Sequence, residues 1–355
     1  MAPIRVGIIG AGNIANFHAD AFRFVPDAEV VAVASLDGEQ GRAFARRCGV
    51  PNVFADYREL LRLSDLDAVT IACPNDLHAR MTMDAADAGK HVICEKPMAL
   101  NLEECDAMIE ACLKAGVLLL YAEQLLFAPK YVHAKTLADE GALGRVHYVR
   151  HSWCHDGPHS DWFWDVEHSG GGVLMDMGCH SIALARWVFD NAPIESISAE
   201  LGTFVHGDRT DGEDHSICVL RFPGDRMALV ENSWTHTNGV DERVELYGSE
   251  GLTVADLSRG RCLTTTHGRT EEIRNGGFPY EMEHFVRCMR GEEQPRSTGE
   301  DGRAVLEAIM AAYASAGRGE RVSLPFAGAR QAKKPIDAWR MMHHAQSLGL
   351  PDDRR

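Results

Sequence analysis

The sequence predicts an α/β fold, in which a doubly wound parallel sheet is followed by an α+β domain with a large open, mainly antiparallel sheet. In the first 123 residues, apolar runs typical of buried strands alternate with helical segments, as in parallel sheets covered on both faces. After residue 124 the predicted strands follow one another through short turns. A length of 355 residues suits two domains. We expect them at residues 1–123 and 124–340, with a C-terminal tail at 341–355.

Composition excludes several classes of partner. The formal net charge of −16 leaves no basic stripe to neutralise phosphates, which argues against a nucleic-acid partner. No apolar run approaches the roughly 18 residues that a membrane span needs. The 10 cysteines are scattered without a Cys-x-x-Cys pair, and the first predicted strand begins too close to Met1 for a signal peptide. We therefore expect a cytoplasmic protein without a membrane partner.

The first predicted strand, residues 4–9, runs directly into the turn Gly-Ala-Gly-Asn-Ile-Ala and then into a helix. In that context Gly10 permits a tight turn, and Gly12 lets the backbone approach a pyrophosphate. The helix N-terminus offers N–H donors to the same anion. A purely structural turn is the alternative, but the position after a first strand favours dinucleotide binding. Asn13 and Ile14 are then among the cofactor-binding residues.

The second predicted strand, residues 29–35, ends where a dinucleotide fold places the residue that reads the ribose. The chain has Ser35, Leu36 and Asp37 there. An acid at the strand end would accept from the 2′-hydroxyl of NAD, whereas Ser35 followed by an arginine would suit NADP, and Leu36 stands in that arginine's place. Asp37 could reach the ribose or could cap the next helix. We expect Ser35 and Asp37 to contact NAD, with NADP as the alternative.

Another predicted strand, residues 67–74, ends at Pro74 and is followed by Asn75 and His78. In open α/β sheets the carboxyl edge of the strands is where ligands bind. We expect Pro74, Asn75 and His78 to face the cofactor, and the alternative is a plain turn with a helix cap.

A strand over residues 91–97 stops abruptly on Glu95, Lys96 and Pro97. At the same edge of the sheet this strand delivers a lysine to the ligand crevice. Alone, the pattern is more often an ordinary surface pair with a proline that ends the strand. The neighbouring motifs favour a functional role for Glu95 and Lys96.

The second half of the chain is rich in strands. We expect a helix over residues 127–140 and a strand from residue 144 to 153. Further strands are predicted at residues 196–205, 215–222, 226–235, 242–248 and 251–255, and helices at 280–290 and 302–315. Pro223-Gly224-Asp225 and Gly248-Ser249-Glu250-Gly251 are hairpin-turn signals between these strands.

Three glycines open the segment Gly-Gly-Gly-Val-Leu-Met-Asp-Met-Gly-Cys-His, from Gly170 to His180. They free the backbone to start a helix against a ligand. Asp176 and His180 fall four residues apart, which places both on one face of a helix. A carboxylate next to an imidazole can orient it, and a histidine poised near pH 7 can accept a hydroxyl proton. In isolation this spacing is more often a surface pair or a core histidine.

The segment from residue 151 to 165 interleaves aromatic side chains with histidines and aspartates. Flat apolar rings beside hydroxyl donors and acceptors suit a carbohydrate, and loops often carry function. We expect substrate contacts from Trp153, His155, Trp162 and Trp164. The alternative is a loop whose tryptophans pack on the sheet. A metal site would use His151, His155, His159 and His168, but their spacing is not standard, and we expect no metal.

Together these motifs resemble the glucose–fructose oxidoreductase/inositol dehydrogenase (Gfo/Idh/MocA) family over nearly the whole chain. The matching residues are Gly10-Ala11-Gly12-Asn13-Ile14-Ala15, Pro74-Asn75 with His78, Ala88-Gly89-Lys90-His91, Glu95-Lys96-Pro97, and Gly170-Gly171-Gly172 with Asp176 and His180. The resemblance implies a Rossmann domain that carries NAD or NADP. It also implies a second domain whose open sheet commonly forms an oligomer interface, as in a homodimer or homotetramer.

The resemblance further implies that Lys96, Asp176 and His180 are catalytic. Two departures matter. Ser35 stands at the position where the family usually has the acidic residue that reads the ribose. The sixth predicted strand covers residues 117–123. The family frequently has Arg-Phe after this strand, where this chain has Gln124-Leu125-Leu126-Phe127, so substrate contacts there cannot be transferred.

The function that follows is hydride transfer between a nicotinamide and a secondary alcohol carbon of a sugar or cyclitol. In this scheme His180 takes the hydroxyl proton, Asp176 orients His180, and Lys96 binds the same oxygen. No arginine cluster requires a phosphorylated substrate, so we expect a neutral sugar or inositol. The alternative is a redox-neutral, NAD-dependent glycosidase or epimerase that acts through a transient keto-sugar. A non-catalytic NAD(P)-binding regulator would not need to keep Lys96, Asp176 and His180.

Overall fold

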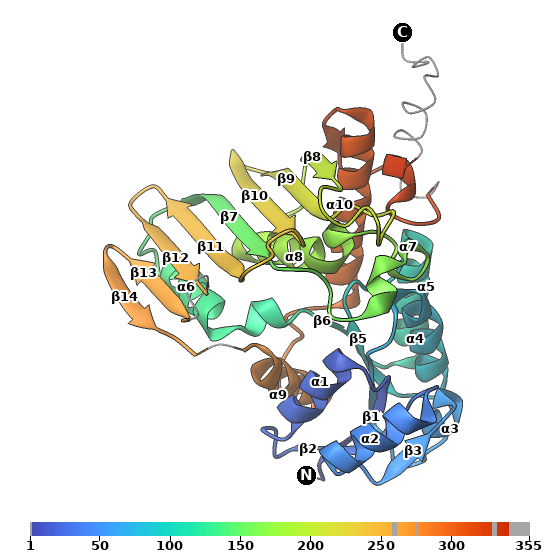
Figure 1. Cartoon of the computed structure of the whole chain (residues 1–355). Coiled ribbons are helices and arrows are strands. Elements are labelled where there is room, and N and C mark those ends of the chain that lie inside the picture. The colour runs from blue at the N-terminus through green and yellow to red at the C-terminus, as the bar shows by residue number, and fades with distance from the viewer. Residues whose placement is uncertain (1, 258–260, 275, 329–331, 341–355) are drawn as a thin grey trace. The chain divides into compact units, whose positions relative to one another are not determined.

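The computed structural model describes residues 2–257, 261–274, 276–328 and 332–340, so the predicted tail at 341–355 lies outside the described residues. The chain forms two compact units, and each is built from separate stretches of sequence (Figure 1). Unit 1 comprises Met1–Ala99, Glu103–Ala128 and Gly276–Arg303, and unit 2 comprises Leu100–Leu102, Pro129–Asn275 and Ala304–Arg355. Within the described ranges, every helix is too short or too polar to span a bilayer.

Unit 1 contains a six-stranded parallel sheet in the order β3-β2-β1-β4-β5-β6. Its strands are β1 (Ile4–Ile9), β2 (Ala28–Ala34), β3 (Asn52–Phe54), β4 (Ala68–Ile71), β5 (His91–Glu95) and β6 (Leu119–Ala122). Strands β4 and β6 are buried at every residue, as expected of strands covered on both faces. The strand order is that of a Rossmann fold, which confirms the predicted doubly wound sheet.

Helices connect these strands and begin at recognisable sequence signals. They are α1 (Asn13–Phe22), α2 (Gly38–Cys48), α3 (Tyr57–Leu61), α4 (His78–Asp87) and α5 (Leu102–Ala115). Asp37 caps α2, and Gly49 ends it in the left-handed conformation with φ of 75°, a position that favours glycine. Asp56 caps α3 through the amide of Arg58.

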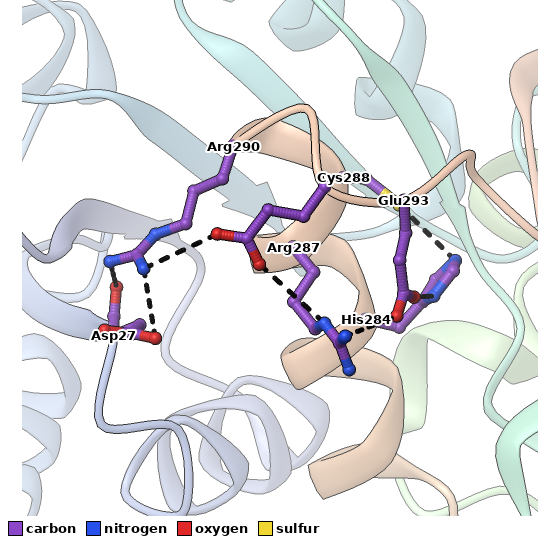
Figure 2. A network of polar contacts seen from close by, with 7 residues as sticks. Asp27, His284, Arg287, Cys288, Arg290 and Glu293 are labelled. Carbon is purple, nitrogen blue, oxygen red and sulfur yellow. Dashed lines mark hydrogen bonds and ion pairs between the residues drawn. The ribbon is translucent and has the colours of Figure 1, made fainter. Parts of the chain in front are cut away.

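Helix α9 (Phe278–Met289) belongs to unit 1, although it follows most of unit 2 in the sequence. It packs against α1, where the rings of Phe17 and Phe278 stack with centroids 5.4 Å apart. Figure 2 shows the polar contacts at the end of α9: Arg290 pairs with Asp27 at 3.0 Å, and Arg287 pairs with Glu293 at 3.0 Å. Ring contacts and ion pairs therefore tie this late segment to the first strands.

Unit 2 contains a nine-stranded sheet in the order β14-β13-β12-β11-β7-β10-β9-β8-β15. Its strands are β7 (Val146–Cys154), β8 (Ser196–Gly202), β9 (His215–Phe222), β10 (Arg226–Ser233), β11 (Asp241–Gly248), β12 (Leu252–Asp256), β13 (Leu263–Thr266), β14 (Arg269–Glu272) and β15 (Val322–Ser323). All pairings are antiparallel except β7 with β10, so the predicted mainly antiparallel sheet is confirmed. Gly224 and Asp225 turn the β9–β10 hairpin with φ of 76° and 57°.

Helices cover one face of this sheet. They are α6 (Pro129–Asp139), α8 (Cys179–Val188) and α10 (Gly299–Arg318), with the short α7 (Val166–Ser169) in the connection before α8. Every second side chain of β9 is buried, including Cys218 and Leu220, whereas Ile217 is exposed and Val219 is half-buried. Among the described residues, the side chains on the other face of β9 are therefore exposed or half-buried. Strands β13, β14 and β15 were not predicted.

Candidate active site

The glycine turn after β1 has the shape that a dinucleotide requires. Gly10 has φ of +109°, and a Cβ there would lie 2.1 Å from the carbonyl oxygen of Ala72, so no other residue fits. A Cβ on Gly12 would meet nothing within 4 Å, and no side chain of the described residues caps α1. The amides of Asn13 and Ile14 lie in the first turn of α1, directly after Gly12. This arrangement fits a pyrophosphate at a helix N-terminus.

At the end of β2, Asp37 caps helix α2. Its Oδ1 accepts hydrogen bonds from the amides of Glu39 at 2.9 Å and Gln40 at 3.0 Å. Ser35 is buried, and Leu36 is 89% exposed. The capping role that the sequence left open for Asp37 is therefore observed, while contacts of Ser35 and Asp37 with a ribose stay predictions.

The residues after β4 form a tight, enclosed turn. Pro74 precedes a 3₁₀ turn that begins with the buried Asn75. His78 is fully buried, and its ring nitrogens lie 2.9 Å from the carbonyl oxygens of Pro97 and Cys73. Burial lowers the pKa of His78. His78 thus joins the turns that follow β4 and β5, and its contact with a cofactor stays a prediction.

Lys96 follows β5 and is half-buried, and the carboxylate of Glu95 fixes the turn from behind. One Glu95 oxygen lies 2.7 Å from Nε2 of His18, and the other accepts from the Lys96 amide at 3.0 Å. Nδ1 of His18 lies 2.8 Å from Oγ1 of Thr70. Glu281 of α9 lies close to this network, and burial, followed by the charge of Glu95, raises the pKa of Glu281 well above its usual value. No pattern in the sequence pointed to His18, which occupies a buried position in α1.

Asp176 lies in unit 2, in a π-helical turn over Leu174–Gly178 that leads into α8. Its Oδ2 accepts a hydrogen bond from Nε1 of Trp234 at 3.1 Å. The sequence predicted a regular helix through Asp176 and His180. A π turn adds a residue to the helical turn, so the spacing of four does not by itself place the two side chains above one another.

His180 is buried in the first turn of α8, and its ring packs against Trp153 with centroids 4.9 Å apart. Behind it, His151 is fully buried, with Nδ1 2.7 Å from Oγ of Ser181. Burial, followed by the charges of Lys130 and His180, lowers the pKa of His151 to about 3. His180 therefore packs on the ring of Trp153 and lies near a histidine that burial keeps neutral.

The aromatic segment divides into two groups. Trp153 contacts both His180 and His155, with ring centroids 4.9 and 6.5 Å apart. Trp162 is half-buried and stacks on Phe163 at 3.9 Å.

Trp164, in contrast, is buried in a cluster with Val173, Met177 and Trp234. The guanidinium of Arg209 lies 4.0 Å from its ring centroid. For Trp164 the structure thus shows the packing role that the sequence left as an alternative. Among the described residues, no group of three or more His, Cys, Asp or Glu side chains is arranged to hold a metal ion.

Residues 4–123 match an oxidoreductase family with an NAD-binding Rossmann fold, and residues 131–254 match the C-terminal domain of the same family. The chain belongs to the Gfo/Idh/MocA family. The six-stranded sheet and the glycine turn are thus the NAD-binding half of a Gfo/Idh/MocA oxidoreductase, and the nine-stranded sheet lies in the half that carries the family's C-terminal domain.

Several Gfo/Idh/MocA proteins resemble the chain over most of its length. Levoglucosan dehydrogenase of Pseudarthrobacter phenanthrenivorans is 30% identical over 78% of this chain and 79% of its own length. Myo-inositol 2-dehydrogenase of Thermotoga maritima is 28% identical over 85% of this chain and 93% of its own length. Among solved structures, GenD2 from gentamicin A biosynthesis in complex with NAD has a TM-score of 0.83, with 28% identity, 91% of this chain covered and 97% of that chain.

Proposed function

We propose that the protein oxidises a secondary alcohol carbon of a neutral sugar or cyclitol with NAD. The observation that carries this proposal is His180, a buried imidazole packed on the face of Trp153. An aromatic face beside a proton acceptor suits a carbohydrate hydroxyl. Family membership supports the redox chemistry, and relatives named for myo-inositol and levoglucosan support the substrate class.

Each residue has a distinct role in this proposal. His180 accepts the hydroxyl proton. Asp176, whose carboxylate accepts a hydrogen bond from Trp234, orients the imidazole of His180. Lys96 donates a hydrogen bond to the same oxygen and stabilises its developing negative charge. When bound, NAD supplies the hydride acceptor.

We favour NAD over NADP as the cofactor. Asp37 puts a carboxylate at the start of α2, which disfavours the 2′-phosphate of NADP, and Leu36 offers no positive charge to it. We further propose Gly10, Gly12, Asn13, Ile14, Ser35 and Asp37 as its binding residues, together with Pro74, Asn75, His78, Glu95 and Lys96.

A redox-neutral cycle is the second candidate. An aldose–aldose oxidoreductase of Caulobacter crescentus has a TM-score of 0.82 to this chain, with 26% identity over 91% of it and 100% of that chain. An enzyme that returns the hydride to a second sugar or to the same one would use the same side chains. Accumulation of NADH during turnover distinguishes the two, because a redox-neutral cycle releases none.

We also propose that the chain forms a homodimer or homotetramer through its nine-stranded sheet. The uncovered face of β9 presents the exposed Ile217 and the half-buried Val219, and the rings of Tyr148 and Tyr247 on β7 and β11 pack 5.2 Å apart.

We propose the cytoplasm as the location of the protein. All ten cysteines are free thiols, as is usual for proteins of that reducing compartment.

The experiment that tests the function measures absorbance at 340 nm with NAD or NADP and a panel of myo-inositol, scyllo-inositol, levoglucosan and simple aldoses. We expect NADH to accumulate with at least one of these. Lys96→Ala and His180→Ala should each lower kcat/KM by at least about 100-fold, because a proton acceptor or a charge stabiliser is lost. Lys114→Ala, an exposed lysine near the end of α5, is the matched control and should stay near the wild-type value.

Near-wild-type turnover of both variants would refute the assigned roles. Turnover of a sugar without net NADH would identify the redox-neutral cycle instead. Binding of NAD without turnover of any polyol or aldose would favour a regulator.

A further inference from the structure

One buried residue binds three successive amides at the start of the segment that carries Asp176 and His180. The carboxylate of Glu213 accepts from the amide of Leu174 at 2.8 Å and from that of Gly172 at 3.2 Å. The amide of Val173, between them, donates to the backbone carbonyl of Glu213 at 2.9 Å. These are the amides that a helix N-terminus leaves unpaired. Within the protein these three amides are therefore all hydrogen-bonded to Glu213.

Tyr313 of α10 completes the contact from the other side. Its hydroxyl donates to Glu213 at 2.8 Å and lies 3.2 Å from the amide nitrogen of Gly172. A Cβ on Gly171 would lie 2.1 Å from the Tyr313 hydroxyl, and one on Gly172 would lie 1.9 Å from the Glu213 carbonyl oxygen. The two glycines thus permit close contact with Glu213 and Tyr313, both of which are fully buried.

Gly172 is joined by hydrogen bonds to the segment that carries the residues proposed to be catalytic. Its carbonyl oxygen accepts hydrogen bonds from the amides of Met175 and Asp176, each at 3.1 Å. The π turn over Leu174–Gly178 continues into α8, which begins at Cys179 and carries His180. A movement of the Gly172 peptide would therefore displace Asp176 within one turn and His180 within two.

We propose that Glu213, together with Tyr313, is a positioning residue that sets the orientation of Asp176 and His180. It touches neither substrate nor cofactor and acts only through the peptides of residues 172–174. The inference rests on the proposed roles of Asp176 and His180. It assigns a function to a buried carboxylate that the reaction itself does not use.

The sharpest variant is Glu213→Gln, which keeps the size of the side chain. It places an NH₂ group against one of the two amide donors, so one hydrogen bond is replaced by a contact between two donors. Tyr313→Phe removes only the hydroxyl and should give a weaker effect of the same kind. Asp214→Asn is the matched control, because Asp214 is equally buried but accepts from the amides of residues 204–206.

Hydrogen exchange followed by mass spectrometry reads the contact itself. In Glu213→Gln the amides of residues 172–174 should exchange at least about 10-fold faster than in the wild type, while exchange in β1–β6 stays the same. Asp214→Asn should instead speed exchange at residues 204–206.

The ring signal of His180 reads the positioning without any turnover. It is recorded with ¹³C-labelled histidine and assigned by its loss in His180→Gln. In Glu213→Gln it should shift, and in Asp214→Asn it should stay in place. With a substrate of the wild type, kcat should fall at least about 10-fold in Glu213→Gln, while the Kd for NADH stays within about two-fold.

Unchanged exchange at residues 172–174 would overturn the inference. So would faster exchange with the His180 signal of the wild type, because Glu213 would then only stabilise the fold. If Glu213→Gln does not fold, Tyr313→Phe takes its place. It should show a smaller increase in exchange at residues 172–174 and a smaller shift of the His180 signal, and the absence of either would overturn the inference. A wild-type protein that turns over no polyol contradicts the proposed function, and the His180 signal then decides the inference separately.

Discussion

At the scale of single residues, two glycines of one motif serve different ends. Gly10 is required by the chain itself, since its φ is positive and Ala72 lies against it, whereas Gly12 has an ordinary φ of −77° and open space beside it. The sequence motif assigns the tight turn to Gly10 and the close approach to a cofactor to Gly12. The structure shows the crowded backbone at Gly10 and the open space at Gly12, and that space fits the proposed contact with a pyrophosphate.

We therefore expect Gly12→Ala to weaken NAD binding at least about 10-fold, because its Cβ occupies space next to the pyrophosphate. The free energy of unfolding of this variant should be lower than that of the wild type by about 1 kcal/mol, since alanine is a poorer N-cap than glycine. Fluorescence titration with NADH and urea denaturation provide the two measurements.

Gly10→Ala is the contrasting variant. Its Cβ would clash with a backbone carbonyl and its positive φ would be strained, so it should destabilise the fold by about 3 kcal/mol. Normal NADH affinity in Gly12→Ala would show that the glycine turn does not bind the cofactor.

Most of the candidate site could be predicted at this scale, because the glycine turn and the ends of the strands are local patterns. The exceptions are side chains whose partners are distant in sequence. His18 pairs with Glu95, 77 residues away, and Tyr313 contacts Gly172, 141 residues away. No spacing along the chain encodes such pairs.

At the scale of elements, strand β7 and helix α8 meet through buried polar side chains. His151 of β7 contacts Ser181 of α8, and Nδ2 of Asn232 on β10 donates to the same hydroxyl at 2.7 Å. A neutral histidine is compatible with this interface, whereas a protonated one is not, because its charge would be buried beside Lys130.

The protein should therefore lose stability in acid through His151. The folded-state pKa of about 3 lies below the unfolded value of about 6.5, so the unfolded state takes up the proton first as pH falls. Between pH 7.5 and 5 we expect the wild type to lose about 2 kcal/mol of unfolding free energy more than His151→Gln.

Urea unfolding followed by circular dichroism at several pH values measures this difference. The other histidines contribute almost equally to both proteins and largely cancel. If the two proteins have parallel curves of stability against pH, then His151 does not stay neutral in the folded state.

Elements were predicted well where they are long and apolar. Strand β9 was located exactly, and β7 and α9 within a few residues. Strand β3 has three residues and β15 only two, while all residues of β14 are exposed and polar. These strands exist because a neighbouring strand offers hydrogen bonds, and that cause is not visible in their own sequence. The π turn was not predicted, because the spacing of Asp176 and His180 is equally compatible with a regular helix.

At the scale of the whole molecule, neither unit is a continuous stretch of chain. Unit 1 needs residues 276–303, which supply more than a covering helix. The amide of Tyr121 on β6 donates to the carbonyl of Ser297, and Arg290 binds Asp27. The parallel sheet is thus bordered at β6 by a segment made much later.

We expect a fragment of residues 1–128 to be less stable than the same fragment joined to residues 276–303 through a flexible linker. Without residues 276–303, the apolar ring of Phe17 loses its contact with Phe278, and Leu120 of β6 loses its bridge to Thr298. The joined fragment should melt at least about 10 °C higher, as several kcal/mol of contacts would produce in a domain of this size.

Thermal melting followed by circular dichroism makes the comparison. A fusion to residues 276–303 in scrambled order is the control for added length. Equal melting temperatures for all three would show that the Rossmann sheet is complete without α9.

The interleaving of the two units has a consequence for synthesis on the ribosome. The segment that completes unit 1 emerges only after most of unit 2 has been made, and unit 2 is complete only after α10 has been made. Neither unit can finish folding while the chain is still short, although domains generally fold as they are made. A chain released by a premature stop codon before residue 276 would carry the parallel sheet without residues 276–303 and an incomplete nine-stranded sheet, and we expect the cell's proteases to remove it.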